Sequence, residues 1–81
     1  MSLSVVQYGS IYTATCADNY AAATLVNIYQ DGVELYSSPS TATGYYTWAP
    51  SAGPHTISCN GYHGNSTPIL DGSASTNINT P

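Results

Sequence analysis

The chain lacks lysine, arginine and phenylalanine, and it has very few charged residues of any kind. Its 81 residues carry a formal net charge of −4, and only 5% of them are charged, against about 25% in an ordinary soluble domain. Without cationic side chains the chain cannot neutralise phosphate groups, so we predict no nucleic-acid binding. A Walker-type nucleotide site and attraction to anionic lipid heads are excluded for the same reason.

Long apolar runs and helical periodicity are missing as well. No run of 18 apolar residues exists, so we predict no membrane insertion. Residues 1–10 have neither a basic segment nor a long apolar segment, so we do not expect a signal peptide. Because the cysteine usage suggests an oxidising setting, three explanations stay open. The chain is a mature or excised domain, it leaves the cell inside a virus particle, or it comes from a hyperthermophile.

Neutral polar residues take the place of charge, since Ser, Thr and Asn together supply 27 of the 81 residues. Tyrosine supplies eight more, and its apolar face with a polar tip suits interfaces and stacking on sugars. We expect a contact surface that includes some of these tyrosines, the alternative being that they only fill the core and its rim. The candidate contact residues are Tyr20, Tyr29, Tyr36, Tyr45 and Tyr62, with Tyr8 as a further exposed aromatic.

Dense β-formers, interrupted at short intervals by twelve Gly and Pro residues, predict several short strands. The expected strands are 3–8, 11–17, 23–30, 33–36, 41–49, 55–59, 66–70 and 73–78. Asp31-Gly32 predicts a two-residue hairpin turn, and we expect further turns at 61–65 and at Asp71-Gly72. We expect one domain over residues 1–81, in which 72–81 is either a flexible tail or an added strand.

The two cysteines, Cys16 and Cys59, lie at matching places in strand-like segments. A bridge between them would close a loop of about 44 residues and stabilise the fold by roughly 4 kcal/mol. Free buried thiols are the alternative. If both cysteines face inward, the strand alternation also turns inward Tyr12, Ala14, Val26, Ile28, Val33, Leu35, Tyr46, Trp48 and Ile57, with His55 near the end of the same face. This agreement supports a two-layer β-fold.

The run WAPSAGPHTISC at 48–59 resembles the corner before strand F of immunoglobulin-like domains, and the hairpin IYQDGV at 28–33 resembles the same modules. The spacing between the cysteines is shorter than in antibody domains, and Trp48 precedes the second cysteine instead of following the first. The chain is therefore similar to a compact bacterial, archaeal or viral module. The resemblance implies an all-β, Ig-like sandwich of about seven short antiparallel strands with one inter-sheet disulfide, Cys16–Cys59.

Three potential metal ligands, His55, Cys59 and His63, are spaced four residues apart. On a strand this spacing puts each ligand about 13 Å from the next, so the three could meet at one ion only if the chain bends at Gly61. We therefore expect no metal and no cofactor.

The sequence offers little evidence for a hydrolase, because it contains no G-x-S-x-G motif and few acidic residues. Two of them, Asp31 and Asp71, are better explained by turns. We predict no enzyme activity. Asn65 begins an N-x-T sequon and is a candidate glycosylation site.

These observations predict a structural module of a virus particle or an extracellular surface, such as a decoration, capsid-associated or filament subunit. The expected partners are copies of the chain itself or a larger shell or surface protein, because neutral surfaces can associate without burying unpaired ions. The alternative is a carbohydrate- or receptor-binding module that uses exposed Tyr and Trp, with glycans as partners.

Overall fold

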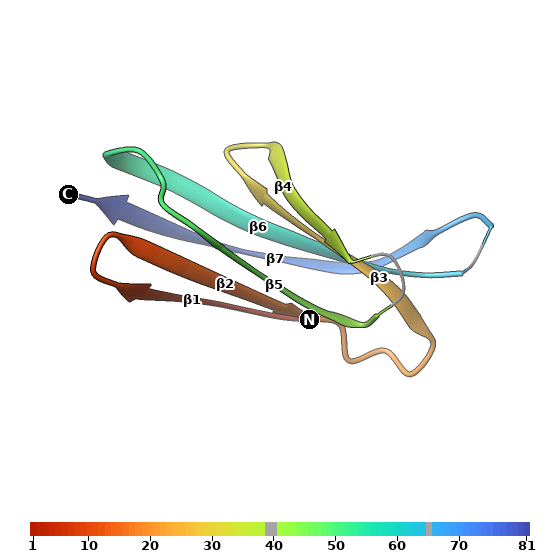
Figure 1. Cartoon of the computed structure of the whole chain (residues 1–81). Helices are drawn as coiled ribbons and strands as arrows, with labels where there is room; N and C mark the ends of the chain where they lie inside the picture. The colour runs from red at the N-terminus through yellow and green to blue at the C-terminus, as the bar shows by residue number, and fades with distance from the viewer. Residues whose placement is uncertain (39–40, 65) are drawn as a thin grey trace.

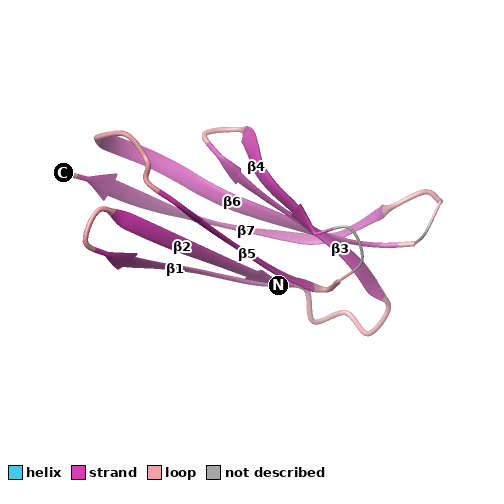
Figure 2. Cartoon of the chain, viewed as in Figure 1, coloured by secondary structure: helices cyan, strands magenta, loops and turns pink. Residues whose placement is uncertain are grey.

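Seven strands and no helix are found in the computed structural model, which describes residues 1–38, 41–64 and 66–81 (Figures 1 and 2). The strands are β1 (Ser2–Tyr8), β2 (Ile11–Ala17), β3 (Ala23–Gln30), β4 (Val33–Ser38), β5 (Thr43–Trp48), β6 (Gly53–His63) and β7 (Ile69–Thr80). They form a three-stranded sheet in the order β1-β2-β5 and a four-stranded sheet in the order β4-β3-β6-β7. All pairs are antiparallel, and the predicted all-β sandwich is confirmed. No helix in the described ranges is long and apolar enough to cross a membrane.

The core lies between the two sheets and follows the alternation of the strands. In β2, Tyr12, Ala14 and Cys16 are buried, whereas Ile11 and Thr15 on the opposite face are exposed, because successive side chains of a strand point to opposite faces. The fully buried core consists of Ala14, Cys16, Val26, Ile28, Ile57 and Cys59, and half-buried Leu35, Tyr36, Tyr46 and Trp48 pack against it.

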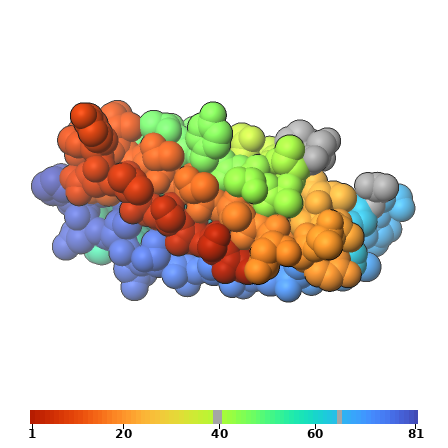
Figure 3. Space-filling view, turned by 90° about the horizontal axis from the view of Figure 1, so that it is seen from below, coloured from red at the N-terminus to blue at the C-terminus, as the bar shows by residue number. Residues whose placement is uncertain are grey.

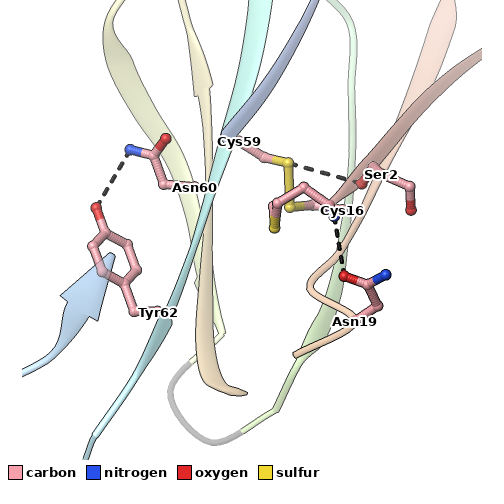
Figure 4. Close-up of a disulfide and its surroundings, with 7 residues drawn as sticks. Ser2, Cys16, Asn19, Cys59, Asn60 and Tyr62 are labelled. Atoms are coloured by element: carbon pink, nitrogen blue, oxygen red, sulfur yellow. Dashed lines mark hydrogen bonds between the residues drawn. A yellow bond between two sulfur atoms is a disulfide. The ribbon is translucent and has the colours of Figure 1, made fainter. Parts of the chain in front are cut away.

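The disulfide joins Cys16 in β2 to Cys59 in β6, with a Cα–Cα distance of 6.2 Å, and both side chains are fully buried (Figure 4). Because β2 and β6 belong to different sheets, the bridge fastens one sheet to the other. The predicted inter-sheet disulfide is confirmed. A second link between the sheets comes from Trp48 in β5, whose indole Nε1 donates a hydrogen bond of 2.7 Å to Gln30 Oε1 in β3.

The predicted hairpin turn at Asp31-Gly32 is confirmed, and it connects β3 to β4. Both residues have positive φ, 51° and 84°, as a two-residue hairpin loop of the I′ kind requires. The prediction that Val33 faces the core is wrong. Val33 pairs with Gln30 directly beside the turn, at the tip of the hairpin, and its side chain is 67% exposed.

The prediction of a turn at Asp71-Gly72 is wrong, and residues 61–63 of the turn expected at 61–65 belong to a strand, whereas residue 65 lies outside the described residues. β6 continues to His63, and both Asp71 and Gly72 lie inside β7. The register shifts here, since Gly61 pairs with Gly72 but Tyr62 pairs with Leu70, so Asp71 is the extra residue of a β-bulge. This bulge is where a buried carboxyl cluster forms, as described below. From Gly72 to Thr80, β7 pairs with β6 of the same chain.

Candidate functional site

The outer face of the three-stranded sheet carries no carboxyl, imidazole or other charged side chain. We call it the neutral face and define it by the outward-pointing residues Ser2, Ser4, Val6, Tyr8, Ile11, Thr13, Thr15, Thr43, Tyr45 and Thr47. In the space-filling view, β1 and β2 (red and orange) form a continuous stretch of surface, with the blue C-terminal strand alongside (Figure 3). All four acids and both histidines lie in the four-stranded sheet or in loops.

Strand register arranges the neutral face in rows. Val6, Thr13 and Thr47 stand opposite one another on three neighbouring strands, and the hydroxyls of the two threonines form a hydrogen bond of 2.9 Å. Besides its hydroxyl groups, the neutral face exposes aliphatic and aromatic side chains: Val6 is 59%, Tyr8 87% and Tyr45 68% exposed. Such a face can be covered by another neutral surface without burying an unpaired charge.

The structure divides the predicted contact tyrosines among different places. Tyr45 lies on the neutral face, and Tyr20 lies in the loop after β2, where its ring packs on His63 with centroids 4.9 Å apart. Tyr36 is half-buried against the core and stacks on Tyr46 at 6.1 Å.

Two further tyrosines, Tyr29 and Tyr62, lie on the outer face of the four-stranded sheet, opposite in direction to the buried side chains of β3 and β6. Each hydroxyl accepts a hydrogen bond from the asparagine two residues earlier, from Asn27 Nδ2 at 3.1 Å and from Asn60 Nδ2 at 3.3 Å (Figure 4). The predicted glycosylation site, Asn65, lies outside the described residues.

One end of β6 holds a histidine between two acceptors. His55 Nδ1 lies 2.6 Å from Asp31 Oδ2, and His55 Nε2 lies 2.7 Å from the backbone oxygen of Ser51. Asp31 Oδ1 also accepts the backbone N–H of Thr56. The pKa of His55 is raised, first by its hydrogen bond to Asp31 and then by the Ser51 carbonyl. Hydrogen bonds from His55 and Thr56 lower the pKa of Asp31.

These residues are of the types found in a serine-hydrolase triad, but their geometry favours another role. The Ser51 hydroxyl lies 3.5 Å from His55 Nε2, farther than the carbonyl of the same residue at 2.7 Å. An acceptor at each ring nitrogen favours the doubly protonated imidazole, whereas a general base needs one nitrogen free to accept a proton. The geometry therefore favours His55 as a cation that ties the turn 49–52 to the β3–β4 hairpin.

A second cluster lies at the bulge of β7. Asp18 is 5% exposed and packs over Gly61, where a Cβ would come within 2.7 Å of its Cβ and Cγ atoms. Burial, followed by the hydrogen bond to Asp71, raises the pKa of Asp18. For Asp71, burial opposes ionisation, but the hydrogen bonds from Asp18 and His63 outweigh it and lower the pKa. With His63 Nδ1 paired to Asp71 Oδ1, this cluster holds two carboxyl groups and one imidazole.

The three potential metal ligands of the sequence do not come together in the structure. His55 and His63 lie at opposite parts of β6, and Cys59 between them is bonded to Cys16. Among the described residues, no group of three or more His, Cys, Asp or Glu side chains is arranged to hold a metal ion. The two Asp–His pairs were not predicted, because the partners are 24 and 8 residues apart and no sequence motif links them.

Comparison of the chain with protein-family models, curated proteins and solved structures finds no match.

Proposed function

We propose that this chain is an immunoglobulin-like assembly module, which packs against copies of itself through the neutral face. Support for the Ig-like assignment comes from strand order. If the strands are lettered as in immunoglobulin domains, the two sheets read A-B-E and C′-C-F-G. The disulfide between β2 and β6 then corresponds to the bridge between strands B and F.

The observation that carries the assembly proposal is the absence of charge from the neutral face. Each copy has a formal net charge of −4 with its histidines counted as neutral, and it remains negative when His55 is protonated, so two copies repel one another unless they meet where no carboxylate lies. In a two-fold contact the same patch meets itself, so any charge on it would face its own image. The neutral face avoids this repulsion, and its rows of hydroxyls, Val6 and Tyr45 supply polar and apolar contacts.

We propose a virus particle or an extracellular surface as the setting. A buried disulfide persists in an oxidising environment, and the chain without lysine or arginine offers trypsin-like proteases no cleavage site. A larger shell or surface protein with a neutral patch could take the place of the second copy.

Sedimentation velocity over a range of protein concentrations tests the proposal. We expect the unaltered chain to self-associate and Thr15→Asp, in the middle of the neutral face, to sediment as a monomer. Asn79→Asp is the matched control, because it adds the same charge on the outer face of the opposite sheet and should leave association unchanged. An unaltered chain that stays monomeric at all concentrations, or equal effects of the two substitutions, would contradict the proposal.

A further inference from the structure

Two asparagine–tyrosine pairs form a nearly two-fold arrangement on neighbouring strands of the four-stranded sheet. Asn27 in β3 stands directly opposite Asn60 in β6, and the two strands run antiparallel. Each asparagine Nδ2 donates to the tyrosine hydroxyl two residues further along its own strand, Tyr29 or Tyr62. Because the strands run in opposite directions, the two pairs point toward each other. Two amides and two phenolic hydroxyls therefore gather at the centre, between two aromatic rings.

These hydrogen bonds fix how the rings lie. Residues two apart on one face of a strand are separated by about 7 Å, which is close to the reach of a tyrosine side chain. A hydroxyl that bonds to the residue two positions earlier therefore draws its ring along the strand. Figure 4 shows Tyr62 reaching toward Asn60 in this way. Tyr29 pairs with Ser58, four residues from Tyr62, so the Cα atoms of the two tyrosines lie roughly 14 Å apart.

The surroundings of the rings are rich in hydroxyl and amide groups. Ser58 pairs with Tyr29, and Ser73 pairs with Asn60. Farther along the same face, Thr56 Oγ1 donates to Asn77 Oδ1 at 3.0 Å. The nearest charged group on this face is the exposed carboxylate of Glu34, which pairs with Tyr29.

We infer that this face, centred on Tyr29, Tyr62, Asn27 and Asn60, binds neutral oligosaccharides. Both rings are half-buried at this surface. The accessible parts of aromatic rings can pack on the apolar faces of pyranose rings, and amide and hydroxyl groups placed beside them fix orientation through hydrogen bonds. A chain without lysine or arginine has no such side chain to pair with sulfate, sialate or uronate, and Glu34 on this face repels these groups. The chemistry therefore selects uncharged sugars.

This face and the neutral face are the outer sides of opposite sheets. A sugar bound to one face therefore does not block assembly through the other face, and either proposal can be refuted while the other holds.

A glycan array carrying neutral glucans, mannans, galactans and xylans beside sulfated and sialylated oligosaccharides tests the inference, with affinities then measured by calorimetry on the soluble glycans that bind. We expect binding to neutral members only, weakened about tenfold or more by Tyr29→Ala or Tyr62→Ala. Tyr62→Phe keeps the ring and should retain most of the affinity. It also separates loss of stacking from loss of folding, which thermal unfolding of each variant monitors.

Tyr45→Ala is the matched control, because it removes an exposed tyrosine from the neutral face. It should leave glycan affinity unchanged. The inference would be overturned by an array without neutral ligands, by a preference for acidic glycans, or by an affinity that survives the loss of both rings.

Discussion

Removal of the bridge between the sheets is the sharpest test of what stabilises this domain. We consider the double substitution of Cys16 and Cys59 by alanine, which deletes the covalent link and buries no new polar group. Both cysteines are fully buried at the centre of the core, so the change also costs some packing. It leaves every strand pairing of the sheets available.

The length of the loop that the disulfide closes determines how much stability its removal should cost. The cysteines are 43 residues apart, and in the chain-entropy model a loop of that size contributes about 4 kcal/mol by restricting the unfolded chain. A domain of 81 residues has a free energy of unfolding of about 4–12 kcal/mol in total. The bridge therefore accounts for a third or more of the stability, and its loss should lower the urea midpoint by about 2–4 M.

Urea unfolding followed by the fluorescence of Trp48 measures the effect, since this single tryptophan contacts both sheets through its bond to Gln30. Unaltered protein unfolded in the presence of a reductant should behave like the double variant. A midpoint shift smaller than about 0.5 M with an unchanged slope would refute the reasoning, because it would mean that the unfolded chain is not restricted by the bridge.

Three further outcomes are expected. Gly44→Ala should lower the free energy of unfolding by about 1–3 kcal/mol in urea titrations, because a Cβ there would lie 2.8 Å from the Tyr36 ring. Gly32→Ala should cost about 1 kcal/mol in the same assay, since residue 32 has a φ of 84°. The paired state of His55 with Asp31 stabilises the fold fully below pH 6.5, the usual pKa of histidine, and this contribution is lost as the pH rises through the raised pKa of the folded state. The melting temperature should therefore fall as the pH rises above the raised pKa of His55, and His55→Gln should remove that fall. If the melting temperatures of the variant and the unaltered chain depend on pH in the same way, His55 is not the group responsible.

The two Asp-Gly dipeptides show where prediction from the sequence succeeds and where it ends. Asp31-Gly32 forms the expected hairpin turn because alternating strands on both sides leave these two residues at the tip. Asp71-Gly72 has the same local preference, but its carboxyl group is drawn into the interior by Asp18 and His63. Contacts from elsewhere in the chain therefore outweigh the local preference of the dipeptide. The contacts of Asp71 with Asp18 and His63 cannot be inferred from the residues next to Asp71 in the sequence.

The same distinction applies to the candidate sites. Strand alternation predicted that Cys16, Ile28 and Cys59 face inward, because one buried face is enough to set the parity of a strand. The outward-facing partners depend on register between strands. That Asn27 meets Asn60, or that Thr13 meets Thr47, follows from pairings that a sequence of this composition does not specify in advance.

The placement of the four acids gives the molecule an electrical asymmetry. Asp18 and Asp71 are buried, and Asp31 shares its charge with His55. The negative charge that solvent meets is thus concentrated at the β3–β4 hairpin, where Glu34 is exposed. The domain should be retained by an anion exchanger more weakly than its formal charge implies, and it should attach to a positively charged support in one orientation, with this hairpin turned toward the support and the three-stranded sheet left accessible.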